Sequence, residues 1–285
     1  MEMILPNDQS ETLSLRFLGT GNAPGVPVHG CRCDICVKAT FNTELRREPC
    51  SALLEINEYK ILLDAGLPDL KQRFPDGTLH SILLTHYHPD HVQGLFPLRW
   101  GLGQVLPVYG PDDQEGCGDL FKNHGILDFI KLAPFQSFEL AGLIVTPVPL
   151  LHSKRTLGYC FEHDSGKLAY LTDTVGLPQK TQSFLKQWKP DLMVLDCSFP
   201  PMDKAPKNHN DLNLALEAYT AIKPKKLLLT HIGHELDVWL NEHEGDLPDA
   251  VGIARDKDRY GMLPIKKPAE PYLIYQKANL SEAGL

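Results

Sequence analysis

Residues 81–91 read S-I-L-L-T-H-Y-H-P-D-H, an apolar run followed directly by three histidines and an aspartate. In an extended chain His86 and His88 point to the same side, because side chains alternate along a strand. Asp90 and His91 follow at the expected start of a helix, where the chain turns and aims them at a second point. Removing these groups from water together is costly unless something binds them. The motif therefore predicts a metal centre, with two ligands offered to each of two ions.

The same arrangement, a short apolar strand that ends in a residue able to bind metal, recurs along the chain. The carboxyl ends of strands in an α/β sheet are where active sites usually gather. His152, Asp173 and His231 could therefore complete two adjacent sites, provided that Asp173 bridges the ions. The predicted strands and the residues that follow them are 60–63 with Asp64, 81–85 with His86, 143–151 with His152, 167–171 with Asp173, and 226–229 with His231.

Helices are expected between these strands, which indicates an α/β class with helices outside and sheets inside. No repeat, low-complexity tract or domain linker stands out, so we expect a single domain over residues 1–285. The polar, proline-rich stretch 200–208 is typical of an active-site loop. The expected helices are 68–74, 90–100, 113–130, 178–188 and 210–222, the last with Asn/Asp capping chemistry at its start.

Composition limits the partners that the chain could have. The formal net charge of −8 argues against nucleic-acid or membrane-surface binding, which usually needs a basic face. We find no apolar stretch of about 18 residues and therefore expect no transmembrane helix. The first ten residues lack the basic and apolar segments of a secretory signal, so a cytoplasmic location is expected.

Three of the seven cysteines lie close together as Cys31, Cys33 and Cys36. In a chain without an export signal, this spacing favours a structural zinc site over disulfides. A closed tetrahedral site would need a fourth ligand, which the spacing does not identify. A reduced, buried cluster or a redox pair is the alternative interpretation.

The segment from Thr85 to His91 resembles the signature of the metallo-β-lactamase superfamily of hydrolases. The resemblance implies a four-layer αβ/βα sandwich with a two-metal site at one edge. It assigns the ligands as follows: His86, His88 and His152 to the first ion, Asp90, His91 and His231 to the second, with Asp173 as the bridge and Asp64 as a residue that orients ligands.

Several further stretches narrow the resemblance to the phosphoribosyl cyclic phosphodiesterase (PhnP) family of the carbon–phosphorus lyase pathway. It covers about residues 13–249 and leaves 250–285 as a C-terminal extension that matches poorly. In this family the counterpart of His234 is the fourth ligand of the cysteine site, and the counterpart of His209 is the general acid. The matching stretches are LGTG at 18–21, the cysteine cluster, HVQGLFPLRWG at 91–101, PVYGP at 107–111, DTVGLP at 173–178 and NHNDLN at 208–213.

The resemblance implies hydrolysis of 5-phosphoribosyl 1,2-cyclic phosphate to ribose 1,5-bisphosphate in phosphonate catabolism, with His209 and Asp90 as catalytic residues. It suggests manganese at both active-site positions, with zinc or iron as alternatives, and zinc at the cysteines. The expected partner is a phosphorylated sugar, with no nucleic acid and no membrane, and the expected assembly is a homodimer. Arg46, Arg47 and Lys154 are candidates for holding the 5-phosphate.

Three other functions remain open at this point. A tRNA 3′-end nuclease would use the same ligands, but it would need a basic arm to grip RNA. A lactone or thioester hydrolase would not need His209. A non-catalytic metal-binding protein would not need so complete a ligand set.

Overall fold

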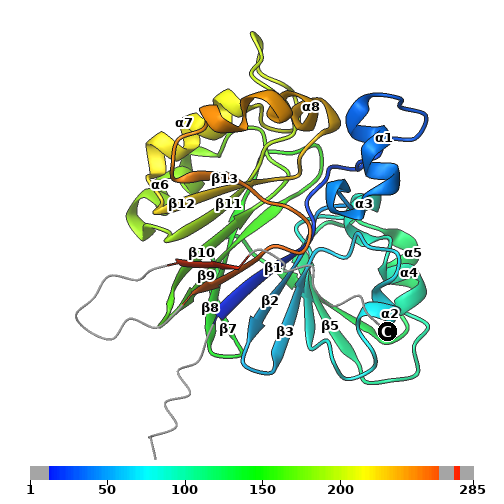
Figure 1. Cartoon of the computed structure of the whole chain (residues 1–285). Helices are drawn as coiled ribbons and strands as arrows, with labels where there is room; N and C mark the ends of the chain where they lie inside the picture. The colour runs from blue at the N-terminus through cyan, green and yellow to red at the C-terminus, as the bar shows by residue number, and fades with distance from the viewer. Residues whose placement is uncertain (1–12, 263–272, 277–285) are drawn as a thin grey trace, which may run out of the picture.

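The computed structural model describes residues 13–262 and 273–276. For Glu244 and for 273–276 it describes the backbone and not the side chains. Two β-sheets pack face to face, and helices cover the outer face of each (Figure 1). The predicted four-layer αβ/βα sandwich is confirmed.

The first sheet runs in the order β15-β14-β1-β2-β3-β4-β5-β6, with β3 to β6 parallel and β15 to β3 antiparallel. Its strands are β1 (Leu13–Gly19), β2 (Ser51–Ile56), β3 (Tyr59–Leu63), β4 (Ser81–Leu83), β5 (Leu106–Pro111), β6 (Leu127–Leu132), β14 (Arg259–Met262) and β15 (Leu273–Gln276).

The second sheet runs in the order β13-β12-β11-β10-β9-β8-β7, and β10 to β13 are parallel. Its strands are β7 (Phe138–Leu140), β8 (Leu143–Pro149), β9 (Leu157–His163), β10 (Gly166–Leu171), β11 (Leu192–Asp196), β12 (Lys226–Thr230) and β13 (Val251–Ile253).

The helices lie in two groups, one on each sheet (Figure 1). On the first sheet are α2 (Leu70–Arg73), α3 (Pro89–Val92), α4 (Leu95–Leu98) and α5 (Gly118–Lys122), and on the second are α6 (Gln179–Trp188), α7 (Leu212–Ile222) and α8 (His234–His243). Between β1 and β2 lie α1 (Asp34–Phe41) and the 3₁₀ turn η1 (Thr43–Leu45), and η2 (Glu244–Asp246) follows α8. None of the described helices combines the length and the apolar character needed to cross a membrane.

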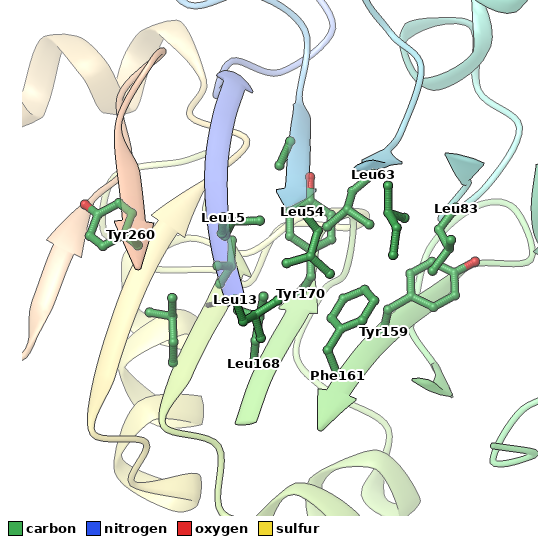
Figure 2. Packing of buried hydrophobic residues seen from close by; sticks show 14 of the residues in the cluster. Leu13, Leu15, Leu54, Leu63, Leu83, Tyr159, Phe161, Leu168, Tyr170 and Tyr260 are labelled. Atoms are coloured by element: carbon green, nitrogen blue, oxygen red, sulfur yellow. The ribbon is translucent and has the colours of Figure 1, made fainter. Parts of the chain in front are cut away.

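The apolar core between the sheets follows from strand alternation. Leu13 and Leu15 of β1 point inward and pack in one cluster with Phe161, Leu168 and Tyr170 of the second sheet (Figure 2). All five side chains are at most 1% exposed. The central strands are buried on both faces, which explains why their sequences are continuous apolar runs rather than alternating ones. In β11, for example, alternate residues pack between the sheets and under the helices.

The five predicted strands that lead to the candidate ligands are confirmed, and so are the helices α6 and α7. The helix expected over 113–130 is wrong: the segment holds the short α5 and then β6, and Gly125 between them has a left-handed φ of +59°. The helix expected over 90–100 is divided into α3 and α4. Asp211 caps α7, because its side chain accepts a hydrogen bond from the amide of Leu214 (3.0 Å).

The sequence resemblance ends near residue 249, but the folded core continues beyond it. β13 extends the second sheet, and β14 pairs with β1 in the first sheet. Tyr260 of β14 is 3% exposed, and its ring contacts Phe17 edge-on at 5.9 Å between centroids. Residues 251–262 are therefore part of the sandwich, whereas most of the remaining extension lies outside the described residues.

Candidate metal centre

Three of the predicted site residues stand within two residues of a strand end in an unusual backbone conformation. Asp64, Asp173 and His231 have φ values of +59°, +62° and +59°. Non-glycine residues rarely adopt this left-handed region, and such strain is concentrated at functional sites. Asp173 and His231 both belong to groups of ligand-type atoms, and Asp64 contacts the ring of His91.

The HxHxDH segment is held against the end of β3 by close backbone contact. The amide of Ala65 donates to the carbonyl of His91 (2.8 Å), and the amide of Gly94 donates to the carbonyl of Ala65 (2.8 Å). A side chain at Gly66 would collide with the carbonyl oxygen of Asp90, so only glycine allows this approach. The two hydrogen bonds of Ala65 and the close approach at Gly66 therefore hold α3 against the end of β3.

The first group of ligand-type atoms comprises His86, His88, His152 and Asp173. Nδ1 of His88 lies 2.9 Å from Nε2 of His86 and 3.0 Å from Nε2 of His152. Oδ2 of Asp173 lies 3.5 Å and 3.6 Å from the Nε2 atoms of His86 and His152. Four potential ligands from three separate segments thus converge on one point.

The second group comprises Asp90, His91 and His231, and Asp173 lies between the two groups. Oδ2 of Asp173 is 3.4 Å from Nε2 of His91, and its Oδ1 is 3.3 Å from Nε2 of His231. Oδ2 of Asp90 is 3.6 Å and 3.9 Å from the same two nitrogens. The structure therefore brings all seven predicted active-site ligands together, with Asp173 placed to serve both groups.

Two buried nitrogens indicate that this arrangement suits cations. Nε2 of His91 and Nε2 of His231 are buried and make no hydrogen bond within the described residues. An unsatisfied buried polar atom costs about 1–3 kcal/mol. Imidazole and carboxylate ligands accept zinc, manganese or iron. The residues present therefore fit divalent ions.

The charges of the metal-free cluster depend on burial and on contacts between neighbouring groups. Burial raises the pKa of the Asp173 carboxyl, but attraction to His231, His91 and His86 outweighs burial and holds this pKa well below its usual value. Burial lowers the pKa values of His86 and His152. Burial lowers the pKa of His91 too, but attraction to Asp173 and Asp64 outweighs burial and holds this pKa well above its usual value. A cation bound there would therefore displace a proton from His91, whereas His86 and His152 resist protonation.

Asp64 lies behind the ligands rather than among them. Its Oδ2 is 3.0 Å from Nδ1 of His91, and its Oδ1 accepts the amide hydrogen of Thr85 (2.8 Å). A partner at Nδ1 fixes the ring orientation and directs Nε2 toward the centre, as is usual for metal-binding histidines. This position agrees with the predicted orienting role.

His209 lies beside the cluster on the loop that precedes α7. Its ring stacks on His231 with 4.7 Å between centroids and lies 5.0 Å from His152. Its Nδ1 contacts Oδ2 of the fully buried Asp196 at 2.8 Å. Burial lowers the pKa of His209, but attraction to Asp196 outweighs it and raises this pKa to about 9. The imidazole is therefore held in its protonated form next to the centre.

Asp196 is a candidate that the sequence prediction leaves out. It ends the apolar strand β11 as Asp173 follows β10, and this same pattern could have identified it. The loop carrying His209 is also held from the other side, because the carbonyl of Asn208 contacts Nδ1 of His152 at 3.0 Å.

The predicted zinc ligands form a separate cluster. Nε2 of His234, the first residue of α8, lies 3.1 Å from Sγ of Cys33 and 3.6 Å from Sγ of Cys31. Sγ of Cys36 lies close enough to complete a group of four. The amides of Cys36 and Val28 point at sulfur atoms, at 3.5 Å and 3.4 Å. This geometry fits a tetrahedral Cys₃His site.

Two of the three predicted phosphate-binding residues serve other purposes. Arg47 is 3% exposed and bonds to Asp237 (2.7 Å), to the hydroxyl of Thr20 and to the carbonyl of Ala254. Arg46 donates to the carbonyls that end α1. Lys154, two residues after His152, makes no ion pair within the described residues.

A family described as "Beta-lactamase superfamily domain" matches residues 59–232, which include all seven active-site candidates. The chain belongs to the metallo-β-lactamase superfamily. The predicted relationship is thereby confirmed, and this superfamily consists of metal-dependent hydrolases.

Solved and curated relatives of this metallo-β-lactamase-fold chain differ in their names. The crystal structure of a diphosphatase from the PhnP family is 26% identical, the match covers 89% of this chain and 99% of that chain, and the TM-score is 0.74. An octanoyltransferase of Porphyromonas gingivalis is 26% identical in an alignment of 257 positions that covers 84% of this chain and 50% of that protein. A ribonuclease Z of Methanopyrus kandleri is 29% identical over 59% of this chain and 53% of its own length. This chain thus spans about half the length of these two curated relatives.

Proposed function

We propose that the protein is a cyclic phosphodiesterase that hydrolyses 5-phosphoribosyl 1,2-cyclic phosphate to ribose 1,5-bisphosphate in the breakdown of phosphonates. The observation that carries this proposal is the position of His209, whose ring is paired with Asp196 and stacks on His231 beside a two-metal ligand set. Opening a cyclic phosphodiester at a sugar oxygen produces a poor leaving group, which needs a proton donor. The similarity to a diphosphatase of the PhnP family supports chemistry at a phosphoryl group.

We assign His86, His88, His152 and Asp173 to one ion, and Asp90, His91, His231 and Asp173 to the other. The two ions, manganese on our proposal, would supply an activated water and neutralise charge on the phosphoryl oxygens. Asp90 keeps 15% of its side chain exposed and is the carboxylate that would accept a hydrogen bond from the attacking water. We assign zinc to Cys31, Cys33, Cys36 and His234.

The proton path follows from the orientation of His209. Its Nδ1 is engaged by Asp196, which leaves Nε2 as the atom that can donate to the departing sugar oxygen. The carboxylate of Asp196 also stabilises the imidazolium before the proton leaves. General acid catalysis of this kind typically contributes about 10²–10⁴ in rate. We propose a phosphorylated sugar as the partner, a cytoplasmic location and a homodimer.

The octanoyltransferase match favours a second candidate, hydrolysis of an acyl thioester. A thiolate leaves readily without protonation, so such an enzyme would gain little from His209. Replacing His209 should therefore greatly reduce activity if the protein is a phosphodiesterase and change it little if the protein is a thioester hydrolase.

Turnover of three substrates by the fully metal-loaded protein tests the proposal. We expect hydrolysis of bis(p-nitrophenyl) phosphate and of the ribose cyclic phosphate, but not of an octanoyl thioester. His209→Ala should keep its metal content, measured by elemental analysis, and should lose activity mainly on the ribose substrate. A loaded enzyme that cleaves only the thioester would refute the phosphodiesterase assignment.

A further inference from the structure

Ser198, two residues after Asp196, contacts the site through its hydroxyl group and is 1% exposed. Its Oγ lies 3.0 Å from Nδ1 of His231, 2.8 Å from the carbonyl oxygen of His231 and 3.2 Å from Oδ1 of Asp196. A hydroxyl carries one proton and accepts through its lone pairs. Ser198 can therefore receive one hydrogen bond from the ring of His231 and give one onward.

The direction of these hydrogen bonds follows from the atom of His231 that faces the centre. Its Nε2 points at Asp173 and Asp90, so it is the atom available to a cation and must be unprotonated when it binds one. The proton of the neutral ring then sits on Nδ1, which donates to Oγ of Ser198. Ser198 keeps one proton to donate, which the carbonyl oxygen of His231 (2.8 Å) and Oδ1 of Asp196 (3.2 Å) can each accept, and donation to Asp196 links the two residues.

Asp196 extends the chain of contacts to the acid. Its Oδ2 accepts from Nδ1 of His209 (2.8 Å) and from the amide of Thr174 (2.9 Å). We propose that Ser198 is a positioning residue, which holds His231 in the tautomer required for metal binding and connects it through Asp196 to His209. This inference rests on the proposed function, because it takes His231 as a ligand and His209 as the acid.

The backbone around Ser198 is fixed independently of its hydroxyl. The amide of Ser198 donates to the carbonyl of Asn210 (2.8 Å). The carbonyl oxygen of Ser198 lies so close to Gly233 that any side chain at Gly233 would collide with it. Removing the hydroxyl should therefore leave the local fold in place. The loss would be confined to the link between His231 and Asp196.

The test is a Mn²⁺ titration of metal-depleted protein whose cysteine site has been filled with one equivalent of Zn²⁺. Mn²⁺ prefers carboxylate oxygens to thiolates, so it reports on the site that contains Asp173 and Asp90. We expect Ser198→Ala to bind one Mn²⁺ as the wild type does and the other about 10–100-fold more weakly, the usual effect of losing such a partner. Ser198→Thr keeps the hydroxyl and should retain both ions.

The chain contains a matched control for this experiment. Ser165 is also 1% exposed, and its Oγ contacts Nδ1 of His163 at 2.7 Å in the turn between β9 and β10. Ser165→Ala breaks the same kind of serine–histidine contact away from the centre and should leave both Mn²⁺ affinities unchanged. Apo thermal melting of each variant shows whether it folds.

A double-variant cycle tests the connection to Asp196 and supplies a second measurement if Ser198→Ala folds poorly. If the two residues act as one unit, Asp196→Asn combined with Ser198→Ala should weaken the second ion no more than the stronger single change. The inference is overturned by additive losses, by equal weakening of both ions, or by wild-type affinities in Ser198→Ala. Because the titration uses no substrate, a wild type that binds two Mn²⁺ but cleaves no phosphodiester would refute the proposed function alone.

Discussion

Replacing Asp64 by asparagine should weaken metal binding without changing any ligand. The asparagine can keep its carbonyl oxygen toward the amide of Thr85, which now donates to Oδ1 of Asp64 at 2.8 Å. Its amide group would then face Nδ1 of His91, which now lies 3.0 Å from Oδ2. Two donors cannot share a hydrogen bond, so the proton of His91 would move to Nε2, the atom that should bind the ion.

The magnitude follows from the contact that is lost. A hydrogen bond to a charged group contributes about 1.5–3 kcal/mol. At about 1.4 kcal/mol per tenfold in affinity, this corresponds to a loss of roughly 10–100-fold, which agrees with the usual effect of removing a partner behind a ligand. We expect the ion at His91 to bind more weakly by this factor in Asp64→Asn.

Calorimetric titration of the metal-depleted protein with Mn²⁺ measures the effect, and Asp119→Asn is the matched control. Asp119 is an exposed carboxylate paired with Arg99 at 2.7 Å, outside the centre. The control should bind both ions with wild-type affinity. If Asp64→Asn did so too, Asp64 would not orient His91, and the reasoning from donor and acceptor geometry would be refuted.

Three further changes should separate the roles of other residues. Asp196→Asn should reduce turnover of the ribose cyclic phosphate more than that of bis(p-nitrophenyl) phosphate, because only the first needs His209 as an acid; equal reductions in the two assays would contradict this role. His234→Ala should release zinc and lower the melting temperature, and chelation of the wild type should reproduce the shift; unchanged zinc content would exclude His234 as a ligand. Burial raises the pKa of Asp256 to about 6, above its value in the unfolded chain, so the folded state binds the proton more tightly. The unfolding free energy of the wild type should therefore fall as pH rises from about 4 to about 6, by at most about 3 kcal/mol and by less because the carboxyl keeps some exposure. Asp256→Asn should lack this component in denaturant titrations, and an identical pH dependence in both proteins would show that Asp256 does not cause it.

Much of the fold was predictable because the strands that form the centre are short, apolar and buried on both faces. Such runs are visible without knowledge of tertiary structure, and each ends in a polar residue that marks the edge of the sheet. The same reasoning failed at 113–130, where apolar residues suit a helix or a strand equally well and only packing against β5 decides. It also failed after residue 249, because pairing between β14 and β1 joins segments at opposite ends of the chain.

The ligand types were predictable from their spacing, but the residues behind them were not. Nothing local to Ser198 distinguishes it from an ordinary buried serine, because its partner His231 is far along the chain. The predicted phosphate-binding role of Arg47 is wrong, and the cause is similar. An arginine in a loop appears available for phosphate, whereas here it is buried against Asp237 of α8.

The left-handed backbone at Asp64, Asp173 and His231 has a consequence for engineering. Each such residue costs about 1–3 kcal/mol of stability relative to a relaxed backbone. A selection for heat resistance alone would therefore favour glycine at these three positions and would remove the centre in the process. Variants intended to be both heat-stable and active should instead carry their substitutions on the surface helices. The thermal stability of the metal-free chain is limited because the three left-handed residues are needed at the metal centre.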